Sequence, residues 1–219
     1  VRDRIGQPIS GWRPFQDWSS SPAAEDAQYV LDDGMRLIRA HRVDEGLKVE
    51  EGIERLRVIL REPRGVVRLV GLSGVGKTRL VQALFDGRIG SAPLDRQLAV
   101  YTEMGDSPDP VPAELLGRIQ SSDHRCILIV DNCGAELHRR LAARLSADSP
   151  ISLITVEYDI SDDEPENTDT FRLEPASKEI IVRWRRFSVQ PSGFAKVGSG
   201  SDYAASLCSG LALSGASPG

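Results

Sequence analysis

Residues 71–78 read Gly71-Leu72-Ser73-Gly74-Val75-Gly76-Lys77-Thr78, and this stretch decides the fold. It fits G-x-x-x-x-G-K-[ST], the pattern of a phosphate-binding P-loop or Walker A motif. Its glycines let successive backbone N–H groups approach phosphate oxygens without a Cβ in the way. A helix that starts here would point its positive dipole end at the same phosphates. The stretch therefore predicts a nucleotide-binding turn between a strand and a helix.

The chemistry assigns a role to each residue type in this loop. Lys77 can reach the β- and γ-phosphates as a point charge, and the Thr78 hydroxyl can bind Mg²⁺. Arg79 follows directly, and either touches the nucleotide or is exposed on the first helical turn. The residues expected to bind nucleotide are Gly71, Leu72, Ser73, Gly74, Val75, Gly76, Lys77, Thr78 and Arg79.

A second element supports the motif. Proteins with a P-loop need an acidic residue at the end of another buried strand to hold magnesium. The run Ile127-Leu128-Ile129-Val130-Asp131 supplies one, because an almost wholly apolar strand ends in a carboxylate. Thr78 and Asp131 are thus the predicted Mg²⁺ ligands. The alternative is that Asp131 caps the helix that follows.

The residue after Asp131 bears on catalysis. Many hydrolytic P-loop ATPases place a glutamate there to activate water, but this chain has Asn132, whose amide cannot accept that proton. We therefore expect slow hydrolysis of the nucleotide. Glu103, just after another predicted strand, could act as the base in place of the missing glutamate. The predicted catalytic set is Lys77, Asp131 and Glu103. No NKxD or TKxD base-reading motif occurs, which favours ATP over GTP.

The surrounding pattern alternates helices and strands and indicates an α/β, three-layer P-loop NTPase fold with a mostly parallel central sheet. Expected helices are 25–41, 49–60, 77–85, 113–119, 135–145 and 177–187. Expected strands are 66–70, 98–102, 126–130, 151–156 and 170–173. An acidic loop is expected over 159–169.

Three zones follow from this pattern. Residues 1–46 form an N-terminal arm, whose cluster of Trp12, Phe15 and Trp18 either packs on the main domain or docks a partner. Residues 47–187 form the NTPase domain. Residues 188–219 contain eight serines and six glycines but only two charged residues, so this tail is expected to be disordered and foreign to the domain.

Composition excludes several classes of protein. None of the 219 residues belongs to an apolar run long enough to span a bilayer, so no membrane partner is expected. The net charge of −5 argues against a general nucleic-acid binder. Three cysteines are too few for a disulfide scaffold, and the first ten residues lack the apolar core of a signal peptide. A cytoplasmic protein is therefore expected.

Residues 49–85, with CILIVDNC, ISLITVEYD and FRLEPASKEII further on, resemble the core of STAND-class NTPases, which include the NB-ARC and NACHT modules of bacterial regulatory and antiphage-defence proteins. The resemblance implies a nucleotide switch. Its expected partners are a second copy of the chain, or effector and sensor domains that lie outside this segment. The chain departs from the class in its tail, where a helical lid and winged helix would follow. It also lacks an Arg at the end of the fourth strand, where Val156-Glu157-Tyr158 stands.

The sequence therefore predicts a Mg-ATP-binding domain with low ATPase turnover that acts as a switch in a STAND-like protein. Two alternatives remain. One is a non-hydrolysing nucleotide-binding scaffold or truncated remnant, which Asn132 and the missing lid favour. The other is a small-molecule kinase, which is favoured less because the sequence has no arginine-rich lid for an acceptor.

Overall fold

The structure is a computed structural model that describes residues 10–19, 36–39, 46–122, 124–158 and 168–174. The chain divides into two compact units, Val1–Ser177 and Lys178–Gly219, and every described residue belongs to the first. The helices among the described residues are α1 (Phe15–Ser19), α3 (Val49–Arg61), α4 (Lys77–Ala83), α5 (Pro112–Ser121) and α6 (Ala135–Arg144), with 3₁₀ turns η1 (Arg96–Leu98) and η2 (Met104–Asp106). None of the helices in this described part is long and apolar enough to cross a membrane.

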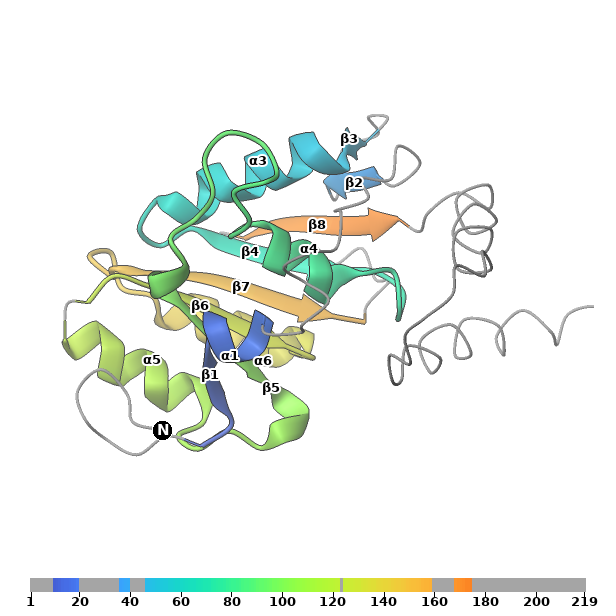
Figure 1. The fold of residues 1–219 in the computed structure, drawn as a ribbon. Coiled ribbons are helices and arrows are strands. Elements are labelled where there is room, and N and C mark those ends of the chain that lie inside the picture. Colours follow the sequence, from blue (N-terminus) through green and yellow to red (C-terminus); the bar gives the residue numbers. More distant parts are fainter. Residues whose placement is uncertain (1–9, 20–35, 40–45, 123, 159–167, 175–219) are drawn as a thin grey trace, which may run out of the picture. The chain divides into compact units, whose positions relative to one another are not determined.

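The eight described strands form one mixed sheet (Figure 1). They are β1 (Trp12–Pro14), β2 (Arg36–Arg39), β3 (Leu47–Lys48), β4 (Val66–Val70), β5 (Ala99–Glu103), β6 (Cys126–Asp131), β7 (Ile151–Glu157) and β8 (Asp169–Glu174), in the order β1-β5-β6-β7-β4-β8-β2-β3. The five central strands are parallel, and β1, β2 and β3 add to the edges as antiparallel strands. The sheet is therefore mostly parallel, as the sequence predicts.

Helices cover both faces of the sheet and make three layers (Figure 1). On one face, residues of α1, α3 and α4 pack against alternate side chains of the strands, such as Ile129 and Ile154. On the other face, α5 and α6 pack against the intervening side chains, such as Leu128 and Leu153. Because both faces are covered, the strands β4 and β7 are buried almost throughout their length.

Most predicted elements occur within one or two residues of their expected bounds, but one prediction is wrong in part. The expected helix over 25–41 does not extend through residues 36–39, which form β2 and pair antiparallel with β8. Tertiary pairing overrides the local pattern there, because Leu37 is fully buried against α3 when its backbone joins the sheet. Residues 25–35 and 40–41, the helix 177–187, most of the acidic loop and the tail lie outside the described residues.

The aromatic residues near the N-terminus pack on the main sheet. Trp12, in β1, is 2% exposed, and its indole Nε1 donates to the Pro110 carbonyl at 2.8 Å. Phe15 is also buried and lies on the opposite face, with ring contacts to Trp18 and Phe85. The packing interpretation of this cluster is therefore confirmed for Trp12 and Phe15.

A buried arginine links α3 to the end of α4. Arg57 is fully buried, and its Nε and two Nη atoms donate five hydrogen bonds. Four of the acceptors are carbonyls at or just after the end of α4, and the fifth is the Glu54 carboxylate: Ala83 O, Leu84 O, Asp86 O, Ile89 O and Glu54 Oε1, at 2.6–3.0 Å. The expected helix over 77–85 ends at Ala83, and the carbonyls of Ala83 and Leu84 accept hydrogen bonds from this guanidinium.

Replacing Arg57 with lysine should lower the free energy of unfolding by about 3 kcal/mol. A lysine keeps the charge but has three donors on one atom, so it leaves several buried carbonyls without a partner. Urea unfolding followed by circular dichroism measures the loss. The matched control is Arg55→Lys, at an exposed position of the same helix, which should change the free energy by less than about 0.5 kcal/mol. Equal effects at the two positions would contradict this role of Arg57.

Candidate functional site

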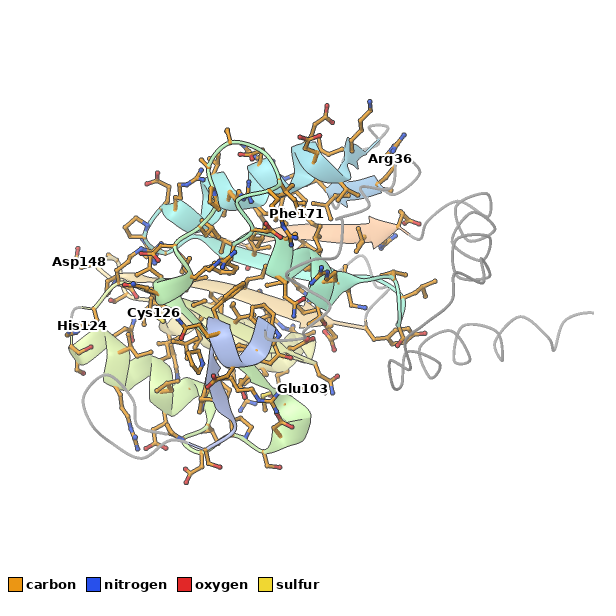
Figure 2. The ribbon with its side chains drawn as sticks, in the orientation of Figure 1. Arg36, Glu103, His124, Cys126, Asp148 and Phe171 are labelled. Atoms are coloured by element: carbon orange, nitrogen blue, oxygen red, sulfur yellow. The ribbon has the colours of Figure 1, made fainter. Side chains whose placement is uncertain are left out.

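The site lies at the edge of the sheet where the parallel strands end. In sheets of this kind, ligands bind outside the carboxyl ends of the strands, where successive connections leave in opposite directions. Strand β4 lies at such a point, because the chain leaves β4 toward β5 on the β7 side, whereas it leaves β7 toward β8 on the other side of β4. In Figure 2, the labelled Glu103 lies at this edge, whereas Cys126 and Asp148 lie at the opposite one.

Three glycines give the P-loop its shape. Gly71, Gly74 and Gly76 have backbone φ angles of 147°, 77° and 93°, which residues other than glycine rarely adopt. At Gly71, an added Cβ would lie 2.7 Å from the carbonyl oxygen of Leu173 in β8. Glycine is therefore required at this position both by the backbone conformation and by the closeness of the neighbouring strand.

Lys77 folds back over the loop that precedes it. Its Nζ donates to the carbonyls of Gly71 at 2.8 Å and of Leu72 at 2.7 Å. Burial lowers the pKa of Lys77 below its usual value, while the nearby Asp131 carboxylate opposes this change. The ammonium group is thus partly desolvated and held by weak, neutral acceptors, which a phosphate group could replace.

The predicted metal ligands meet. The Thr78 hydroxyl donates to Asp131 Oδ2 at 2.7 Å, although 53 residues separate them in the chain. The backbone N–H of Asn132 donates to the other carboxylate oxygen at 2.9 Å, helped by a left-handed φ of 55° that asparagine tolerates. Hydroxyl and carboxylate oxygens are ligands that Mg²⁺ prefers when nucleotide phosphates supply the rest, so the pair fits this ion. Among the described residues, no group of three or more His, Cys, Asp or Glu side chains could hold a metal ion.

Tyr101 also contacts Asp131, which the sequence analysis did not foresee. Its hydroxyl donates to Asp131 Oδ2 at 3.2 Å, and the residue is only 4% exposed. Burial, followed by the charge of Asp131, raises the pKa of Tyr101 well above its usual value. The contact arises because β5 and β6 are parallel neighbours whose register brings these two side chains to the same face.

The other two predicted residues lie near this cluster. Glu103 is the last residue of β5, is exposed, and stands opposite Asp131 in the register of the two strands. Because β5 and β4 lie on opposite sides of β6, Glu103 is on the side of Asp131 that faces away from β4, the strand before the P-loop. Arg79 lies along α4, where its guanidinium donates to the side chain of Gln82 at 3.1 Å.

A partly buried ion pair lies on the face of the sheet that α6 covers. Arg68, in the middle of β4, is 1% exposed and pairs with the Glu157 carboxylate at the end of β7. The register places Glu157 beside Val70, the residue just before the P-loop. Strand β7 has no arginine of its own, but Arg68 reaches its end from the neighbouring strand β4. The sequence feature that indicates this ion pair is a charged residue, Arg68, inside an otherwise apolar strand.

The P-loop, the parallel strand order and the helices on both faces together define a three-layer P-loop NTPase-like fold. No family model matches the chain, and no curated protein matches it either. Among solved structures, the closed state of Hsp104 with ATPγS and FITC-casein is similar at 19% identity and a TM-score of 0.43, over 65% of this chain and 30% of that one. A HORMA:CdnC:Trip13 complex of E. coli MS115-1 is similar at 12% identity and a TM-score of 0.45, over 78% and 79%. The chain thus spans under a third of the length of the Hsp104 chain.

A histidine is buried behind the site, and its partners among the described residues are two threonine hydroxyls. His138, in α6, is fully buried, and its ring nitrogens lie 2.7 Å from Thr155 Oγ1 and 3.0 Å from Thr168 Oγ1. Burial, followed by the charges of Arg68 and Arg139, lowers the pKa of His138 from 6.5 to about 4. The imidazole is therefore neutral in the folded protein at neutral pH.

This histidine should make the protein less stable in mild acid. Because the pKa of His138 is lower in the folded than in the unfolded chain, the unfolded chain binds the proton more tightly. The free energy of unfolding should therefore fall by about 2 kcal/mol from this group as the pH drops from 7.5 to 5. Urea unfolding across this range measures the fall. His138→Gln should remove that part of the pH dependence, while His124→Gln, at an exposed position, should leave it intact. An unchanged slope in His138→Gln would contradict the assignment.

Proposed function

We propose that this chain is a Mg-ATP-binding domain that hydrolyses ATP slowly and acts as a nucleotide switch in a STAND-like signalling or defence protein. The observation that carries the proposal is the contact between Thr78 and Asp131 at 2.7 Å. It joins the P-loop to the end of a second buried strand, which is the arrangement that a nucleotide-bound magnesium ion requires. Mg²⁺, when bound, would neutralise phosphate charge.

The remaining residues of the loop support phosphate binding. Leu72, Ser73, Gly74 and Gly76 are exposed, so their backbone is accessible to a ligand. Lys77 stands beside the loop with its ammonium on the carbonyls of Gly71 and Leu72. A triphosphate would offer this charge stronger acceptors than neutral carbonyls. The choice of ATP over GTP and the STAND-like role rest on the sequence motifs.

Slow hydrolysis is proposed from the residues around Asp131. Asn132 holds the position where a proton-accepting glutamate would activate water, and its amide cannot do so. Glu103, beside Asp131 in the sheet, is the proposed base, although it lies one strand further from the P-loop than Asp131 does. Because this distance from the P-loop makes Glu103 a less favourable base, a second candidate function is a nucleotide-bound scaffold that does not hydrolyse ATP.

Binding can be tested by titrating a fluorescent ATP analogue in the presence of Mg²⁺. Lys77→Ala should weaken binding at least about tenfold, because a charge-assisted contact to phosphate contributes about 1.5–3 kcal/mol. Arg140→Ala removes a positive charge from an exposed position of α6 and should leave the affinity unchanged. Unlabelled ATP should displace the analogue better than GTP does. A folded wild-type chain that binds no analogue would refute the proposed function.

Hydrolysis can be tested by steady-state release of phosphate. The wild-type turnover should be well below about 1 s⁻¹, the lower end for ordinary enzymes. Glu103→Gln should lower it by a further factor of about 100 if Glu103 is the base, with nucleotide affinity unchanged. Glu136→Gln, at a position 82% exposed, is the matched control.

Three outcomes of this assay are informative. Fast wild-type turnover would exclude the switch. Binding without any turnover would favour the scaffold. Equal rates in wild type and Glu103→Gln would remove Glu103 from the mechanism.

A further inference from the structure

Asp131 is held by more donors than the P-loop supplies. Its Oδ2 accepts hydrogen bonds from the hydroxyls of Thr78 and Tyr101, and its Oδ1 accepts one from the backbone N–H of Asn132. Both carboxylate oxygens therefore have a donor, and Oδ2 has two. Because the donors come from three separate segments, they restrict rotation of the carboxylate as well as its position.

Tyr101 is itself held in place by residues 12–19, the N-terminal segment that contains β1 and α1. The ring of Trp18, in α1, stacks on the ring of Tyr101 with a centroid distance of 4.3 Å and an angle of 11°. Trp18 in turn meets Phe15 edge-on at 5.7 Å, and the guanidinium of Arg96 lies over the Phe15 ring at 5.2 Å. Strand β1, just before α1, pairs with β5, which carries Tyr101. The segment is thus anchored beside the strand that it supports.

We propose that Tyr101 is a positioning residue for the metal ligand Asp131, and that the stacked Trp18 makes the N-terminal segment part of this support. The inference rests on the proposed function and deepens it, since it concerns the magnesium ion of the same site. Partners of this kind fix the orientation of a metal ligand, and their loss lowers metal affinity about 10–100-fold. The N-terminal segment would therefore tune the affinity for Mg²⁺ without touching the nucleotide.

A purely structural role of Tyr101 makes a different prediction. Most of the ring contacts, including the stack on Trp18, would persist in phenylalanine, which lacks only the hydroxyl. If the residue served only to fill the core, Tyr101→Phe would leave the Mg²⁺ dependence unchanged. If the hydroxyl orients Asp131, the same substitution would affect the metal and spare the metal-free binding of nucleotide.

The test separates metal affinity from nucleotide affinity. The fluorescent ATP analogue is titrated in EDTA, and Mg²⁺ is then titrated at a fixed concentration of the analogue. Tyr101→Phe should raise the Mg²⁺ midpoint about tenfold, with binding in EDTA unchanged within about twofold. The matched control is Tyr158→Phe, at a position 60% exposed, which should keep the wild-type midpoint. An unchanged midpoint in Tyr101→Phe would overturn the proposal.

The role of Trp18 has its own pair of variants. Trp18→Leu should raise the Mg²⁺ midpoint several-fold because the aromatic stack is lost, and Trp18→Phe should restore most of the wild-type value. Equal midpoints for Trp18→Leu and wild type would remove the N-terminal segment from the proposal. This pair also keeps the proposal testable if Tyr101→Phe does not fold.

The outcomes distinguish this inference from the proposed function. If the folded wild-type chain binds no analogue with or without Mg²⁺, the proposed function is wrong and the inference is wrong with it. If the wild type binds in a Mg²⁺-dependent way and the variants at Tyr101 and Trp18 match it, only the inference is wrong.

Discussion

The buried guanidinium of Arg57 is the interaction on which the position of the P-loop helix depends. Helix α4 has only seven residues, so it cannot be stable by itself and needs support from outside. Arg57 supplies this support by donating five hydrogen bonds, four of them to carbonyls at or just after the end of this helix. Helix α3 is capped in a similar way, since Arg125 donates to the carbonyl of Leu60 at 2.6 Å. Two arginines therefore connect the sheet to α3 and α3 to α4.

With α4 held in this way, the site is assembled from separate strand ends. Lys77 and Thr78 begin α4, Tyr101 comes from β5, and Asp131 ends β6. Their polar groups converge because the strands are parallel and covered on both faces, so their carboxyl ends share one edge. Tyr101 is only 4% exposed, and a hydrogen bond from so buried a residue is stronger than in water. The proposed nucleotide chemistry depends on this convergence.

The antiparallel strands extend both edges of the sheet. Strand β1 covers the free edge of β5, while β2 and β3 extend the sheet beyond β8. Such edge strands satisfy backbone groups that would otherwise be open to pairing with another chain. Helix α1, which follows β1, is linked to Asp131, because Trp18 stacks on Tyr101 and Tyr101 donates to the Asp131 carboxylate. A segment that is outside the parallel core is thereby coupled to the proposed metal site.

The sequence by itself determined the P-loop, the positions of the central strands and the choice of Thr78 and Asp131 as the expected magnesium ligands. These features have local signals, namely glycine spacing, apolar runs and an acidic residue at a strand end. Only the tertiary structure decided that residues 36–39 join the sheet, that α4 ends at Ala83, and that Tyr101 donates to Asp131. Each of these depends on which strands and helices become neighbours and in what register. That information lies in contacts between residues far apart in the chain, because a shift of one residue in register turns a side chain to the other face.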